Sequence, residues 1–182
     1  FVECHFYRRN RDDPYFVTET GIHGINLLEY FFGAIRRVET RRWSQQDRHA
    51  YNWLAVLEFA SGVQGLITFF PFAGVNLERI EAHGSDLSLY LEPALNYTDE
   101  PTSRIVINEN TRENRLQQEI IAEDETNPLV TGGFIGEYGE FFEAVVTGKP
   151  TTSNFQNAWT TVEVAEFISF GQSATFSRHS GQ

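Results

Sequence analysis

Apolar residues recur at helical spacing near the start of the chain. Four of them lie three or four residues apart and form one face of an amphipathic helix over about residues 18–33: Ile22, Ile25, Leu28 and Phe32. Thr20 is the expected N-cap, and Gly33 stands where a left-handed C-cap belongs. We therefore predict a first helix that begins near Thr20 and ends at Gly33.

Two more helices are predicted near the end of the chain. The first has an apolar face made of Phe134, Tyr138, Phe141, Phe142 and Val145, and it ends at the Gly148-Lys149-Pro150 break. The second covers about residues 154–172, and its expected inward positions are Ala158, Val162, Ala165 and Ile168. The pattern thus places a helical layer in the C-terminal third.

Between these helices the sequence is rich in strand-forming residues. The expected strands cover 1–7, 38–43, 51–59, 63–70, 79–83, 87–91 and 104–107. The short connections at 60–62 and 84–86 contain glycine, so each is expected to join its two neighbouring strands into a hairpin. The polar stretch 108–127 shows no period and is expected to be a mobile excursion.

This order of elements predicts an α+β fold in a single domain over residues 1–182. A helix, a run of strands and two helices favour a mostly antiparallel sheet, packed against helices on one face, over alternating βαβ units. The 51–59 strand has Tyr51, Trp53 and Phe59 on one side, while Leu54 and Val56 lie on the other. Because both faces are apolar, both need cover. We therefore expect a homo-oligomer that forms through an open sheet face carrying Tyr51, Trp53 and Phe59.

Composition and charge narrow the class of protein. The 182 residues carry a formal net charge of −11, because 25 carboxylates face 14 cations. Such a field repels phosphate backbones, so no nucleic acid partner is expected. No apolar run approaches the ~20 residues that span a bilayer, so no membrane partner is expected either. The single cysteine and the lack of a signal-peptide pattern favour a cytoplasmic location.

Several chemical motifs are missing from the sequence. No G-x-G-x-x-G or P-loop follows a strand, so we expect this chain to bind no nucleotide cofactor by itself. The five histidines lack zinc-ligand spacing, and no serine lies in a G-x-S-x-G elbow. Neither a metal site nor a serine hydrolase is therefore predicted. Lys149 is the only lysine. The lack of methionine, even at position 1, indicates a fragment, a processed product or a sequence from which some residues are missing.

One pair of residues has a spacing that suits catalysis. Glu19 and His23 are four residues apart, so a carboxylate and an imidazole share one side of the first helix where it begins. A carboxylate that orients an imidazole suits proton transfer near neutral pH. Alternatively, His23 caps the helix or satisfies a buried polar contact. From the residues alone, both interpretations stay open.

A resemblance to a known family is carried by the run ETGIHGINLLEYFFG at 19–33. It resembles the D-x-G-x-H-x-x-D-x-x-x-x-x-x-G signature of the Gfo/Idh/MocA oxidoreductases, the family of glucose–fructose oxidoreductase and inositol dehydrogenase. Three later segments, at 57–63, 80–89 and 141–150, resemble that family's C-terminal domain in the same order. Glu19 stands where the family usually has Asp, and Asn26 replaces its second acidic position.

The resemblance implies a function and a missing domain. Members of the family bind NAD or NADP in an N-terminal Rossmann domain that also carries an E-K-P lysine, and this sequence shows neither. We therefore expect the C-terminal substrate-binding and oligomerisation domain of an NAD(P)-dependent oxidoreductase, inactive alone, that acts on a sugar or cyclitol hydroxyl. A non-catalytic carbohydrate-binding or dimerisation module is the alternative.

The resemblance also assigns roles to residues. His23, oriented by Glu19, is the expected acid/base that exchanges a proton with the substrate hydroxyl while hydride moves to nicotinamide. Asn26, Tyr15 and Thr20 are expected to contact the sugar or polyol substrate. Five aromatic residues either stack on a sugar ring or belong to the core or an interface: Tyr15, Phe16, Tyr51, Trp53 and Trp159.

Overall fold

The computed structural model describes residues 1–44, 50–93, 102–110, 115–121 and 127–176. The strands are β1 (Val2–Tyr7), β2 (Ile35–Ser44), β3 (Tyr51–Phe59), β4 (Gln64–Phe70), β5 (Leu77–His83), β6 (Leu87–Glu92), β7 (Arg104–Asn110), β8 (Arg115–Ile121) and β9 (Ala174–Thr175). The helices are the π-helical turn η1 (Phe16–Gly21), α1 (Ile22–Phe32), α2 (Pro128–Thr131), α3 (Phe134–Thr147) and α4 (Phe155–Ser169). Within these ranges, every helix is too short or too polar to span a bilayer.

The strands in the described ranges form one nine-stranded sheet. Their order is β8-β7-β6-β5-β1-β4-β3-β2-β9. Every neighbouring pair is antiparallel except β1 and β4, which run parallel with Cys4 opposite Ile67. The predicted hairpins are present as β3–β4 and β5–β6. The predicted α+β fold with a mostly antiparallel sheet is therefore confirmed.

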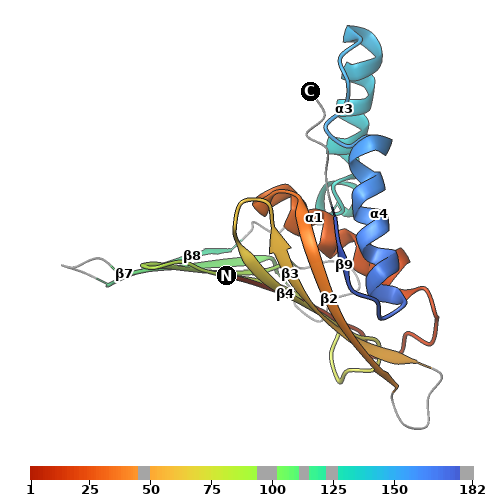
Figure 1. The fold of residues 1–182 in the computed structure, drawn as a ribbon. Helices are drawn as coiled ribbons and strands as arrows, with labels where there is room; N and C mark the ends of the chain where they lie inside the picture. The colour runs from red at the N-terminus through yellow and green to blue at the C-terminus, as the bar shows by residue number, and fades with distance from the viewer. Residues whose placement is uncertain (45–49, 94–101, 111–114, 122–126, 177–182) are drawn as a thin grey trace.

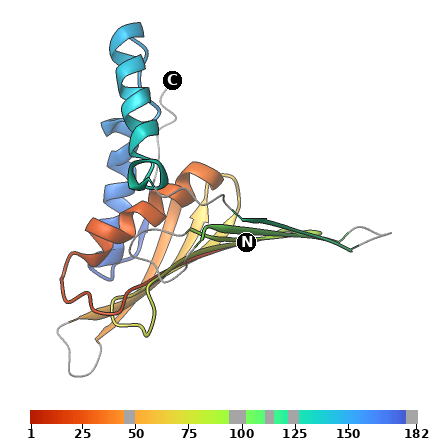
Figure 2. The same ribbon diagram turned by 180° about the vertical axis from the view of Figure 1, so that it is seen from behind.

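The helices lie on one side of this sheet, as Figure 1 and Figure 2 show from opposite directions. Between them and the sheet lies one hydrophobic core, to which β1, β3 and β4 contribute aromatic side chains. Its largest fully buried side chains include Phe16, Phe59, Phe69, Ile25 and Leu28. Burial of side chains this large removes the most apolar area from water and is the main stabilising contribution to the fold.

The covered face of β3 is the one that carries its aromatic residues. Trp53 and Phe59 are only 2% and 1% exposed, and Trp53 stands opposite Phe69 of β4. The prediction that these residues lie on an open, self-associating face was therefore wrong. The uncovered face carries Leu54 and Val56, and Val56 is 43% exposed in the interior of the sheet. The bulkier of two apolar faces is buried because it removes more area from water.

The first helix forms where the sequence predicts it, but it begins differently. Gly33 ends α1 with a φ of 85°, and its N–H donates to the Glu29 carbonyl at 2.9 Å. The predicted N-cap, Thr20, lies inside η1 instead, and Gly21 occupies the N-cap position without a side-chain hydrogen bond. Because the chain is already helical before α1, the first N–H groups of α1 follow a preceding turn and need no side-chain cap.

Helix α4 is present, but its buried face is shifted from the predicted one. Ala165 and Ile168 are buried as predicted, whereas Ala158 and Val162 are exposed. Thr161 and Val164 take their places in the core. Helix α4 packs against η1 and α1, and the buried positions among its described side chains all lie after residue 160.

Helix α3 has an apolar face that no described residue covers. The five predicted positions are all on a helix, but each is between 48% and 66% exposed, and Val146 is 84% exposed. Figure 1 shows α3 extending away from the sheet. A contiguous apolar surface of this kind is typical of a region that contacts another part of a protein assembly.

One strand lies where the sequence predicts an excursion. β8 pairs antiparallel with β7, with Ile107 opposite Gln118. The expectation of an excursion over 108–127 was therefore wrong for residues 108–110, which belong to β7, and for residues 115–121. Every side chain of β8 is exposed, so the strand has no alternation of apolar and polar positions to predict it. The rest of that stretch beyond Asn110 and before Asn127 lies outside the described residues.

Two glycines allow the helical segment to approach the sheet closely. A Cβ at Gly24 would lie 2.2 Å from Cε2 of Phe6, and one at Gly21 would lie 2.3 Å from Cε1 of Phe69. Both distances are far below van der Waals contact. Any larger residue would therefore push α1 away from β1 and β4.

We expect Gly24→Ala to lower the free energy of unfolding by about 1–3 kcal/mol, because the added methyl overpacks the contact with Phe6. Gly139→Ala is the matched control, since a Cβ at Gly139 in α3 meets no atom within 4 Å. It should raise stability by up to ~1 kcal/mol through helix propensity. Urea unfolding of the two variants measures both effects, and equal stability of Gly24→Ala and the wild type would contradict the packing.

Candidate functional site

His23 is the second residue of α1 and follows directly after the π-helical turn. Single π-helical turns are rare and often occur at functional sites. Gly21 and Gly24 on either side pack closely against Phe69 and Phe6 of the sheet, while the His23 side chain is exposed. The local sequence therefore holds the backbone against the core and presents the imidazole outward.

The larger of two cavities at His23 has a volume of about 500 Å³ and is made of polar side chains. It is lined by Arg8, Asn10, Arg11, Glu19, Thr20, His23 and Asn76. The structure thus brings three of the predicted site residues together. The side chains of His23 and Glu19 form no hydrogen bond or ion pair within the described part of the chain, so both are available to a ligand.

The smaller cavity at His23, about 250 Å³, lies toward α4. It is lined by Ile22, His23, Asn26, Tyr30, Thr152, Ser153, Ala158 and Thr161. Asn26 therefore shares this cavity with His23. Its walls are anchored by Glu29, whose carboxylate accepts a hydrogen bond from Thr161 Oγ1 at 2.7 Å and from the Ile35 N–H at 3.3 Å.

A second anchor holds the connection between α3 and α4. The Thr152 N–H donates to Glu140 Oε1 at 2.5 Å, and this hydrogen bond lowers the pKa of the Glu140 carboxyl. The carboxylate of α3 thus fixes the loop that contributes Thr152 to the smaller cavity.

Tyr15 is the one predicted site residue that lines neither cavity at His23. It is 60% exposed and lines a separate cavity with Tyr51 and Trp53. Of the other aromatic residues named above, Phe16 belongs to the core and Trp159 is 71% exposed. The aromatic residues therefore divide into core, cavity wall and open surface.

A buried ion pair holds one of the residues that line the larger cavity, Arg8. Arg8 Nη2 donates to Glu78 Oε1, and the two residues are only 4% and 8% exposed. Arg8 Nη1 also donates to the Tyr7 carbonyl at 2.9 Å. Beside it, Arg11 Nε donates to Asp13 Oδ2 at 2.8 Å. Both guanidinium groups at the cavity are therefore held by carboxylates, which fixes the direction of their remaining donors.

Cys4 and His5 point to opposite faces of β1, as the sequence predicts for neighbours on a strand. Cys4 is fully buried, and burial, with a smaller contribution from the charge of Glu78, raises the pKa of its thiol far above the usual range. The thiol therefore stays protonated and takes no part in nucleophilic chemistry. Within the described ranges, no group of three His, Cys, Asp or Glu side chains has the geometry of a metal site.

Sequence reasoning missed Arg8, Arg11 and Asn76. No role was predicted from the sequence for residues 8–14, although three arginines in the four positions 8–11, shortly before the helical segment of His23, are a usable signal. Asn76 precedes β5 and carries no such signal. It reaches the site because β1 pairs with β5, so that Tyr7 stands opposite Leu77.

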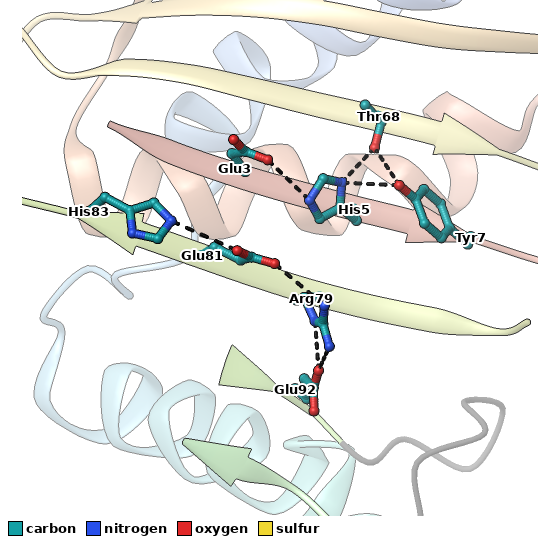
Figure 3. A network of polar contacts seen from close by, with 8 residues as sticks. All are labelled: Glu3, His5, Tyr7, Thr68, Arg79, Glu81, His83 and Glu92. Atoms are coloured by element: carbon teal, nitrogen blue, oxygen red, sulfur yellow. Dashed lines mark hydrogen bonds and ion pairs between the residues drawn. The ribbon is translucent and has the colours of Figure 1, made fainter. Parts of the chain in front are cut away.

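A second polar cluster lies on the uncovered face of the sheet (Figure 3). It consists of Glu3, His5, Tyr7, Thr68, Arg79, Glu81, His83 and Glu92. His5 is its centre: Nδ1 lies 2.8 Å from Thr68 Oγ1 and 3.2 Å from the Tyr7 hydroxyl. Burial lowers the pKa of His5, and the carboxylates of Glu3 and Glu81 oppose this shift. The cluster joins β1, β4, β5 and β6 on the face opposite α1.

Similar proteins were found by family and by structure. The family model described as "Oxidoreductase family, C-terminal alpha/beta domain", of the Gfo/Idh/MocA type, matches residues 7–182. No curated protein sequence matches the chain. Levoglucosan dehydrogenase in complex with NADH and levoglucosan is similar with a TM-score of 0.74 at 12% identity, over 98% of this chain and 59% of that one.

A second similar structure is UDP-N-acetylglucosamine 3-dehydrogenase from Acidithiobacillus ferrooxidans. Its TM-score is 0.70 at 12% identity, over 94% of this chain and 52% of that one. At such identities the likeness shows the fold. The chain spans a little over half the length of these solved structures. Because the family model covers nearly all of its residues, this chain belongs to the Gfo/Idh/MocA oxidoreductase family and carries that family's C-terminal alpha/beta domain.

Proposed function

We propose that this chain is the substrate-binding domain of an NAD(P)-dependent oxidoreductase that oxidises a hydroxyl of a sugar or cyclitol. The observation that carries the proposal is His23, an exposed imidazole at the start of α1 that lines two cavities, with Glu19 and Thr20 in one and Asn26 in the other. The similar levoglucosan and UDP-N-acetylglucosamine dehydrogenases act on sugars, and this supports the substrate class.

The cofactor belongs to a domain outside this chain. None of the helices in the described ranges begins with a glycine-rich loop directly after a strand, which is the arrangement that holds a dinucleotide pyrophosphate. When bound, nicotinamide accepts a hydride from the substrate carbon. NAD and NADP both fit this scheme, and the choice between them lies with the other domain.

In this mechanism His23 removes the proton. Loss of hydride from a hydroxyl-bearing carbon produces a carbonyl only if the hydroxyl proton leaves as well, and Nε2 or Nδ1 of a neutral imidazole accepts it. Glu19 lines the same cavity without a direct hydrogen bond to His23, and in this mechanism it orients the ring through a water. Arg11 and Asn76 donate hydrogen bonds to other oxygens of the substrate and so hold its reacting hydroxyl at His23.

A non-catalytic carbohydrate-binding or dimerisation module remains the alternative function. It requires the same cavities but no partner domain. The sequence upstream of Phe1 in the gene distinguishes the two, because a Rossmann fingerprint and an E-K-P lysine there would establish the enzyme.

We expect the 182-residue chain alone to show no measurable binding of NADH or NADPH by isothermal titration calorimetry, because it lacks a phosphate-binding loop. A polypeptide that also contains the proposed Rossmann domain should bind one of them and oxidise a polyol. Micromolar binding of either dinucleotide to the 182-residue chain would contradict the proposal that another domain binds the cofactor.

The uncovered sheet face is where we place self-association with a second copy. It combines exposed apolar residues of β3, such as Val56, with the polar cluster around His5. Val56→Arg should convert the oligomer to a monomer, since a buried unpaired guanidinium opposes association. Val145→Arg on α3, at a residue 66% exposed on another surface, is the comparison, and loss of the oligomer in this variant alone would place the interface on α3 instead. Light scattering measures both masses, and a monomeric wild type at high concentration would contradict the interface.

A further inference from the structure

A third cavity, which the proposed reaction does not use, has four aromatic side chains in its wall. It has a volume of about 400 Å³ and lies between the segment before η1, the β2–β3 pair and the C-terminal end of α4. Tyr15, Tyr51, Trp53 and Phe170 line it. Only Ile22 is shared with a cavity at His23. The volume lies in the range of small-molecule sites.

The aromatic wall is held in place by a common anchor. Trp53 Nε1 donates to the Ser169 carbonyl at 3.1 Å, and Arg42 Nη1 donates to the same oxygen at 3.0 Å. The Tyr51 and Trp53 rings are 6.1 Å apart, and the Arg42 guanidinium lies 4.3 Å from the centre of the Tyr51 ring. β2, β3 and the end of α4 are thereby joined, so the wall is preorganised for a ligand.

Three of the aromatic side chains in the cavity wall are exposed to solvent. Tyr15 is 60% exposed, Phe170 63% and Tyr51 41%, although each borders a concave surface. Aromatic rings left open around one cavity lose the apolar burial that a packed core would give them. A flat apolar ligand surface would restore that burial.

The polar groups of the cavity restrict the chemistry of the ligand. Asp13 Oδ1 is a buried acceptor without a hydrogen-bond partner in the described part of the chain, while Oδ2 accepts from Arg11. The terminal torsion of Asp is broad, so a small rotation presents the unpaired oxygen to the cavity. Glu166 adds a carboxylate that forms no side-chain hydrogen bond within the described ranges, and Arg42 adds donors.

A neutral polyhydroxylated ring matches this combination of groups. Its hydroxyls donate to the carboxylates of Asp13 and Glu166 and accept from Arg42, and its C–H face stacks on the aromatic wall. A cationic ligand would meet the Arg42 guanidinium on the face of Tyr51, and an anionic ligand would meet two carboxylates. We propose that this cavity, which we call the Tyr51 cavity, is a second saccharide-binding site, independent of His23 and of any cofactor.

The test is saturation-transfer NMR on the 182-residue chain with maltose, methyl glucoside and myo-inositol, and with tetramethylammonium as a cationic probe. We expect saturation of the sugar C–H protons in the wild type. Tyr51→Ala, which removes a stacking ring at a part-exposed position, should weaken the affinity about tenfold. Glu166→Gln, at an exposed position where misfolding is not expected, should weaken it as well.

The control variant is Tyr138→Ala, which removes an exposed tyrosine from α3, away from the cavity, and should leave the affinity unchanged. Three results would overturn the proposal: no saturation of any sugar by the wild type, undiminished binding in both cavity variants, or binding of tetramethylammonium in preference to the sugars. None of these results depends on whether His23 is catalytic.

Discussion

His23→Ala in the complete oxidoreductase should lower turnover by about 10²–10⁴-fold, the usual contribution of a positioned acid/base. The structure supports this site because His23 lines two cavities and is not part of the core. Stability should change by less than about 0.5 kcal/mol, since the side chain is exposed and bonded to no described residue. Steady-state kinetics with the sugar substrate and thermal unfolding of the same variant measure the two effects.

The pH dependence of the reaction separates a chemical role from a structural one. Loss of the acid/base should remove a pH-dependent limb of the turnover profile, whereas a merely displaced substrate should raise KM and keep the limb. His83→Ala is the matched control, because His83 lies on the uncovered sheet face in the cluster around Glu81. Wild-type turnover by His23→Ala would contradict the proposed mechanism.

Glu78→Ala should destabilise the domain by about 3–5 kcal/mol. It would remove the Glu78 carboxylate from the Arg8 guanidinium, which is only 4% exposed and lies in a medium of low dielectric constant. Arg8 lines the larger cavity at His23, so the variant should also weaken substrate binding. Urea unfolding measures the loss of stability.

The double variant Arg8→Met, Glu78→Leu distinguishes the loss of the Arg8–Glu78 charge interaction from lost packing. It removes both charges and keeps most of the buried volume, so it should be more stable than Glu78→Ala alone. If the single and double variants lose equal stability, the cost lies in packing and the buried charge is not its cause.

Regular apolar patterns predicted helices and strands reliably in this sequence. The helix 22–32 and the strands of the two hairpins were predicted because each has one face that packs against the core and therefore alternates or repeats. β8 was missed because all of its side chains are exposed, so its stability comes from backbone pairing with β7 and leaves no trace in the pattern. Helix α3 shows the opposite relation, because its apolar pattern predicted the helix correctly although the apolar face is exposed in the structure.

The candidate site was predictable where its residues are neighbours in the chain. Glu19, Thr20 and His23 lie within one helical turn or two, and local geometry alone places them on one cavity. Arg8 and Asn76 come from separate segments that meet only because β1 lies between β4 and β5. Tyr15 is close to His23 in sequence but lines the Tyr51 cavity, because the helical turn η1 separates the two residues.

The sequence by itself determined the longer helices and the strands that pack on the core, the absence of a nucleotide-binding motif and the family of this protein. Propensity, periodicity and motif spacing are local properties, so they can be recognised without knowing which elements pack against each other. The tertiary structure alone decided which face of β3 is covered, and it decided that Arg8, which lines the larger cavity at His23, pairs with Glu78. The covered face depends on which of two apolar faces buries more area against the helices, and the Arg8–Glu78 pair depends on strand order. Both depend on the free energy of the whole chain, not on a local pattern.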